Sequence, residues 1–145
     1  TCPRPAERLG VMRFLMDTNI AGHYINRRHG VFDKARAEVA HGNPIGIGLP
    51  VLAELVAGIE HSRSRDRNMK SLKTALASLR VWPFDSPAAF EYGRIYAELA
   101  RLGRPVGVVD MMIAAIAMTL GNCTVVSSDS DLLAIPGLKV VNWRA

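Results

Sequence analysis

Short apolar runs alternate with longer amphipathic segments along most of this chain. Five runs have the length of strands: MRFLMD (12–17), PIGIGLP (44–50), VWPF (81–84), TVVS (124–127) and LKVVNW (138–143). Helical patterns fill much of the sequence between them, at 31–41, 51–60, 66–79, 87–102 and 109–120. Apolar strands separated by helices predict a three-layer α/β/α fold around a central, mostly parallel sheet.

Several residues mark where these helices begin and end. Pro50 suits the first turn of a helix, because the N–H that it lacks would be unpaired there. Ser86 and Pro87 predict a capping residue followed by a first helical residue, and Gly103 with Pro105 predicts the end of that helix. The helix over 109–120 is apolar all round, so we expect it to be buried against the sheet.

Four acidic residues follow strands or lie near helix starts in this pattern. Asp17 ends the run FLM, and Asp129 comes just after TVVSS. Glu54 lies one turn beyond Pro50, and Asp110 stands at the head of VDMMIAAIAMTL. In an open parallel sheet the ligand site lies beyond the carboxyl ends of the strands, where helices also begin. We therefore expect all four carboxylates at one rim of the sheet.

Each of these acids also has an ordinary structural explanation. Asp17 could cap the next helix, and Asp110 could complement the positive end of its helix dipole, an effect of roughly 0.3–1 kcal/mol. Glu54 could be a solvated glutamate, and in SSDSD at least one of Asp129 and Asp131 could form a turn. Four acids that can reach one rim together favour a functional site.

Composition limits the classes of protein that this chain can be. Its 145 residues are 49% hydrophobic, enough for one globular domain, which we assign to residues 12–145. Residues 1–11 resemble an N-terminal extension, disordered or introduced by cloning. The longest apolar stretch, near 111–118, is too short to cross a bilayer. Cys2 and Cys123 are too few for a disulfide framework, so we expect a cytoplasmic protein without membrane contact.

The charge of the chain points to an acidic partner. Lys and Arg number 18 against 13 Asp and Glu, for a net charge of +5. Without the four acids of the rim the remainder would carry +9, which suits a protein that attracts a polyanion and offers it metal ions. In HSRSRDRNMKSLK, Arg63, Arg67 and Lys70 fall at helical spacing on one face, suited to phosphate contacts with RNA. A solvated helix face is the alternative.

Histidine chemistry is not indicated, and one pair of tyrosines has two explanations. The four histidines stand in unrelated polar contexts and are expected at the surface: His23, His29, His41 and His61. Tyr92 and Tyr96 share a helix face near Ile95, which could belong to the core or to a dimer seam. We expect core packing for both tyrosines.

The acidic residues and their surroundings resemble one known family. Four motifs, in this order and at these spacings, are similar to those of the PIN-domain nucleases: Asp17-Thr18-Asn19 after a strand, Glu54-Leu55 with Gly58 on a helix, GVVDMMIAA around Asp110, and VVSSDSDLLAIPGLKVVNW. Within them, the chain resembles the VapC-type toxins of bacterial toxin–antitoxin pairs. The resemblance covers residues from about Met12 to Trp143.

The resemblance implies a Rossmann-like parallel sheet and Mg²⁺- or Mn²⁺-dependent cleavage of RNA to a 5′-phosphate and a 3′-hydroxyl. It also implies homodimers and neutralisation by a cognate VapB-type antitoxin. Four residues match the acidic quartet that would bind the metal: Asp17, Glu54, Asp110 and Asp129. Glu54 would bind through water or orient the attacking hydroxide. Asn19 and Ser127 match positions that support the quartet by hydrogen bonding.

The chain departs from the family pattern after Ser127. Asp129 and Asp131 compete for the position of the fourth acid, and Leu132-Leu133 replaces an aromatic residue. Two alternatives to a nuclease stay open: a PIN-like module that binds RNA or protein without cleaving, and a phosphate-ester hydrolase of the haloacid dehalogenase type. The second normally needs another aspartate two residues after the first, but position 19 is Asn.

Overall fold

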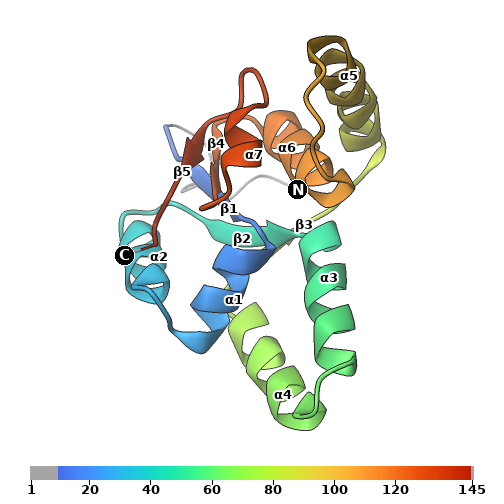
Figure 1. The fold of residues 1–145 in the computed structure, drawn as a ribbon. Helices are drawn as coiled ribbons and strands as arrows, with labels where there is room; N and C mark the ends of the chain where they lie inside the picture. The colour runs from blue at the N-terminus through green and yellow to red at the C-terminus, as the bar shows by residue number, and fades with distance from the viewer. Residues whose placement is uncertain (1–9, 145) are drawn as a thin grey trace.

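Five short parallel strands form the central sheet, as the apolar runs predict. The computed structural model describes residues 10–144, so the extension expected at 1–11 lies almost wholly outside the described residues (Figure 1). The strands lie in the order β3-β2-β1-β4-β5. Their bounds are β1 (Arg13–Met16), β2 (Ile45–Gly48), β3 (Arg80–Trp82), β4 (Cys123–Val126) and β5 (Val140–Val141).

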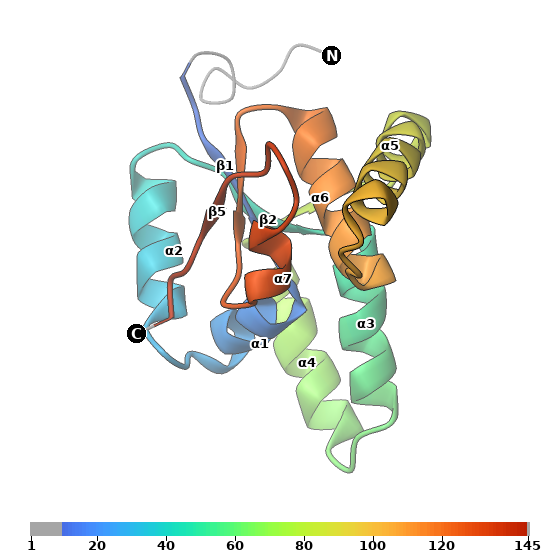
Figure 2. The same cartoon turned by 45° about the horizontal axis from the view of Figure 1, so that its top comes forward.

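Seven helices in the described chain surround this sheet. They are α1 (Thr18–Asn26), α2 (Val31–Ala40), α3 (Leu49–Glu60), α4 (Arg65–Leu76), α5 (Ser86–Leu102), α6 (Val108–Leu120) and α7 (Ser130–Leu133). Figures 1 and 2 show α5, α6 and α7 on one side of the sheet and α1 and α2 on the other, while α3 and α4 form a hairpin that extends away from it. The predicted three-layer, Rossmann-like architecture is confirmed, because helices cover both faces of a parallel sheet.

The core lies between the sheet and its covering helices. β2 and β4 are buried along their whole length, as expected for strands covered on both faces. α6 buries six of its 13 residues, all between Met111 and Ala117, where its apolar sequence packs against the sheet. Gly46 explains why a glycine interrupts a buried strand: a Cβ there would lie 2.3 Å from the carbonyl oxygen of Arg80 on β3. The two strands can approach this closely only because position 46 has no side chain.

Three local features differ from the sequence prediction. α5 is capped by Asp85 and not by Ser86, since the Asp85 carboxylate accepts the N–H of Ala88 at 3.1 Å. A one-turn helix, α7, forms where only a turn was expected. Core packing was the wrong expectation for Tyr96, which is 58% exposed, because adjacent helix positions point in different directions and Ile95 takes the buried one. No helix within residues 10–144 is long and apolar enough to cross a membrane.

Candidate active site

The site lies between β1 and β4. There the chain stops adding strands on one side of β1 and begins to add them on the other. Met16 pairs with Val126 in the parallel register, so the residues that follow leave the sheet side by side. The Asp17 N–H donates to the carbonyl oxygen of Val126 at 3.0 Å and extends this pairing by one step. Ligand sites of open α/β sheets occur at such a switch point, beyond the carboxyl ends of the strands.

Asp17 is both a helix cap and a member of the site. Its Oδ1 accepts the N–H of Ile20 at 2.9 Å, which caps α1, and its Oδ2 accepts the hydroxyl of Ser127 at 2.5 Å. Burial raises the pKa of Asp17, whereas the bonds from Ser127 and Ile20 lower it and the charge of Asp129 raises it again. The carboxylate is therefore fixed in one orientation at the exit of β1.

Ser127 links the ends of two neighbouring strands. Its side chain is buried, and its hydroxyl donates to Asp17 while it accepts the N–H of Asp129 at 2.9 Å. One hydroxyl thus donates its proton to Asp17 and uses an oxygen lone pair to accept a hydrogen bond from the loop that carries Asp129 and Asp131. The structure places Ser127 where the sequence expects a supporting residue, directly between two acids of the expected quartet.

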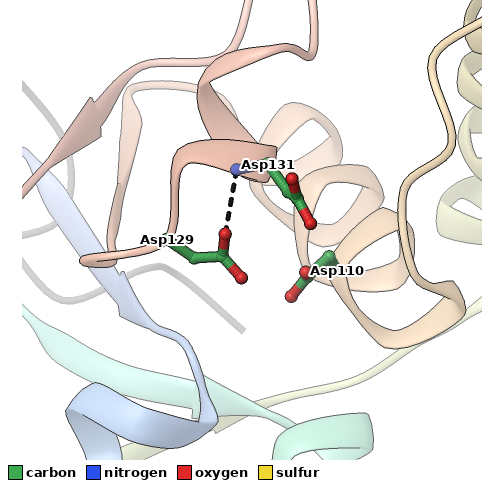
Figure 3. A group of neighbouring side chains, drawn as sticks. All are labelled: Asp110, Asp129 and Asp131. Carbon is green, nitrogen blue, oxygen red and sulfur yellow. Dashed lines mark hydrogen bonds between the residues drawn. The ribbon is translucent and has the colours of Figure 1, made fainter.

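Three carboxylates converge at one place, from α6 and from the start of α7 (Figure 3). Oxygens of Asp110, Asp129 and Asp131 all lie within 4.8 Å of one another. Asp129 caps α7, because its Oδ1 accepts the N–H of Asp131 at 2.9 Å. Figure 3 shows the three side chains pointing toward one another from α6 and from the start of α7. Both candidates for the fourth acid, Asp129 and Asp131, therefore reach the same place.

The charges of all five acids meet at Asp110. The pKa of Asp110 is raised to about 6, first by burial and then by the charges of the other four acids, in this order: Asp129, Asp17, Asp131 and Glu54. Like charges so close disfavour complete ionisation in the absence of a cation. Asp17 and Asp129 cap helices and Asp110 lies in the first turn of α6, so the positive ends of three helices offset part of this repulsion.

Glu54 is held at the edge of the site by Thr18, for which the sequence predicted no role. The exposed Glu54 carboxylate accepts the hydroxyl of Thr18 at 2.5 Å. The signal available in the sequence was a hydroxyl directly after Asp17. Asn19, by contrast, is exposed in the first turn of α1, and its side chain forms no hydrogen bond within residues 10–144. A supporting role for Asn19 stays a prediction.

The basic residues expected to contact RNA lie apart from this cluster. Arg63 is in the turn before α4 and not on the helix, so the predicted common helical face contains only Arg67 and Lys70. Arg67 donates to Ser64 Oγ at 3.1 Å, and Lys70 lines a hollow of about 510 Å³ between α1, α2 and α4. In Figures 1 and 2 the turn between α3 and α4 lies at the end of the hairpin farthest from the sheet.

The donor set of the site is suited to a hard divalent cation. Every side-chain ligand that the acidic residues can offer is a carboxylate oxygen, and neither histidine nor cysteine belongs to the convergent group. Mg²⁺ and Mn²⁺ prefer oxygen ligands, and Mg²⁺ commonly binds one or two carboxylates together with water and substrate phosphate. The residues present therefore fit such an ion.

Comparison with known proteins places this geometry in a family. The PIN domain matches residues 14–138. The chain is 32% identical to the tRNA(fMet)-specific endonuclease VapC of Shigella flexneri, over 92% of this chain and 99% of that protein. It is 30% identical to the ribonuclease VapC2 of Rickettsia felis, over 91% and 98%. The crystal structure of VapBC2 from Rickettsia felis, bound to a DNA fragment from its promoter, contains a chain that superimposes with a TM-score of 0.84 over 91% of this chain and 99% of that chain.

Proposed function

This chain belongs to the PIN-domain family, in its VapC group, and on that premise we propose that it is a metal-dependent endoribonuclease acting as the toxin of a toxin–antitoxin pair. The observation that carries the proposal is the convergence of Asp110, Asp129 and Asp131 beside the buried Asp17. Family membership removes the haloacid dehalogenase alternative. A binding module without activity is disfavoured, because the chain keeps every acid that cleavage would need.

The residues of the site divide the work of hydrolysis among them. Asp17 and Asp110, with Asp129 or Asp131, would hold Mg²⁺ or Mn²⁺, which supplies charge neutralisation at the phosphate and a bound water of lowered pKa. Asp110 is mostly ionised above about pH 6, so it is ready to bind a cation at neutral pH. Glu54, exposed and oriented by Thr18, can accept a proton from the attacking water.

Partners follow from the relatives, and we propose them for this chain on that basis. Initiator tRNA is the first RNA to test, since the Shigella flexneri relative is named for it. A VapB-type antitoxin is expected because the Rickettsia felis structure is a VapBC complex. A homodimer is also proposed: α5 exposes Phe90, Tyr96 and Leu102, an apolar surface that a second copy could cover. We place the protein in the cytoplasm, where its RNA substrates are.

The test is cleavage of total RNA and of initiator tRNA by the wild type and by Asp110→Asn. The substitution removes one charge with almost no change in volume, so we expect cleavage to be lost while the fold is kept. Asp33→Asn is the matched control, because Asp33 also lies in the first turn of a helix but outside the acidic cluster. Full activity of Asp110→Asn, or undiminished wild-type cleavage in excess EDTA, would contradict the proposal. RNA binding without cleavage in any divalent ion would indicate the binding module instead.

A further inference from the structure

Basic side chains gather at the C-terminal end of α1, outside the acidic cluster. His23 is six residues after Asp17, which corresponds to about 9 Å along the helix axis. Its ring contacts that of His29, with centroids 4.5 Å apart and an interplanar angle of 74°. The carbonyl oxygen of His23 accepts the N–H of Arg28 at 2.9 Å, so the end of α1 folds these three residues together.

The segment after β5 brings a second arginine to this group. β5 is parallel to β4, so the chain after it leaves the sheet at the same carboxyl edge as the acids. Trp143 is buried and packs on Phe14, with ring centroids 5.0 Å apart, and Asn142 Oδ1 accepts the N–H of Arg144 at 2.9 Å. Figures 1 and 2 show this segment running toward α2. The backbone of Arg144 is therefore anchored by the core.

His23 lies within electrostatic range of both arginines and of Asp17. Burial lowers the pKa of His23, the charges of His29, Arg144 and Arg28 lower it further, and the charge of Asp17 raises it. His23 is thus the member of the group that lies within electrostatic range of a site acid, and because its pKa is lowered it is mostly neutral at pH 7, a hydrogen-bond donor without a net charge.

No acid in the described part of the chain neutralises either arginine. Arg28 and Arg144 are exposed, and within residues 10–144 neither forms an ion pair or a side-chain hydrogen bond. Arg27 is engaged elsewhere, because its guanidinium lies 4.0 Å over the centre of the Phe32 ring. Two cations that have no partner within residues 10–144, gathered around His23, make a local anion site, and they offset the repulsion that the carboxylates exert on a polyanionic substrate.

We propose that Arg28 and Arg144, with His23 and His29 between them, hold a phosphate of the RNA strand that flanks the bond cleaved at the acidic site. This inference rests on the proposed ribonuclease function. Guanidinium groups bind phosphate oxygens through charge-assisted hydrogen bonds, and such contacts position the strand without reading its sequence. This subsite, not the distant end of the α3–α4 hairpin, sets how the strand enters the acidic site.

The experiment compares RNA binding by two variants that are not expected to cut the probe. One carries Asp110→Asn alone, and the other carries Asp110→Asn together with Arg28→Ala and Arg144→Ala. The probe is a fluorescently labelled single-stranded RNA of mixed sequence, titrated in Mg²⁺ at several salt concentrations. We expect the slope of log affinity against log salt to fall by about 1.4, roughly 0.7 for each lost phosphate contact. The ratio of the RNA affinity with both arginines to the affinity without them should fall by about sevenfold as the salt concentration rises from about 50 to about 200 mM. With Asp110 intact, the double variant should raise KM and leave kcat nearly unchanged.

The control removes two exposed cations elsewhere, by Lys139→Ala and Arg101→Ala. Lys139 precedes β5, at the opposite edge of the sheet from Arg144, and Arg101 lies on α5. An equal loss of salt dependence in the control would overturn the subsite, since the effect would then follow net charge alone. An unchanged salt dependence of RNA affinity in the variant that lacks Arg28 and Arg144 would also overturn the subsite. In that case, cleavage of RNA by the wild type would still support the nuclease proposal. A wild type that neither binds nor cleaves RNA would overturn both.

Discussion

Replacing Asp110 by asparagine should stabilise the metal-free protein at neutral pH and have no such effect in acid. The pKa of Asp110 is raised from its ordinary value of 3.8 to about 6, so the folded state disfavours the ionised carboxyl. Below about pH 4 the carboxyl is protonated whether the chain is folded or unfolded, and the penalty is absent. It appears as the pH rises through the interval between these two values, and it is complete above about pH 6. The asparagine variant carries no charge at this position and escapes the penalty.

The size of this effect follows from the shift and from the exposure of the side chain. A rise of about two pH units would correspond to roughly 3 kcal/mol if the group were fully buried. Asp110 is only half-buried, so solvent screening reduces the expected gain to about 1 kcal/mol. In a domain of this size, that corresponds to an increase in Tm of about 2–4 °C.

Thermal melts followed by circular dichroism, in EDTA at pH 8 and near pH 4, measure the gain directly. Asp33→Asn is the control: it also removes a first-turn acid, but it should slightly destabilise α2 through the helix dipole. Mg²⁺ should raise the Tm of the wild type and have much less effect on Asp110→Asn, because a ligand that prefers the folded state stabilises it. An Asp110→Asn variant that is less stable than the wild type at pH 8 in EDTA would show that the carboxylates do not repel one another as described.

Four further substitutions test the parts of the site. Ser127→Ala should lower the free energy of unfolding by about 1–3 kcal/mol in urea titrations, because it removes the donor to the buried Asp17 carboxylate; unchanged stability would mean that this hydrogen bond is replaced. Asp129→Asn and Asp131→Asn should differ in melts with Mg²⁺: the true ligand loses the Mg²⁺-induced rise in Tm, and equal retention by both would exclude them as ligands. Thr18→Val should lower kcat about tenfold with little change in KM, since it releases the α3 glutamate from its fixed orientation; steady-state kinetics that match the wild type would remove this positioning role.

Local pattern was sufficient for most of the elements. The end of α5 at Gly103 was readable because the left-handed backbone there, with φ of 64°, favours glycine. The buried α6 was readable because no hydrophilic face interrupts its apolar sequence. The Asp85 cap was missed because both Asp85 and Ser86 are good capping residues, and only the path of the backbone decides which of them faces the free N–H groups.

By itself, the sequence determined which carboxylates the chain can offer and that strands and helices deliver them to one edge, because these are properties of short segments. Only the tertiary structure decided how they meet. Ser127 contacts Asp17 across 110 residues of sequence, a contact that depends on β4 lying beside β1 in one register. The position of Arg144 likewise depends on β5 adding to the sheet beyond β4. Strand order and register are global properties of the packed chain, so no local pattern can specify them.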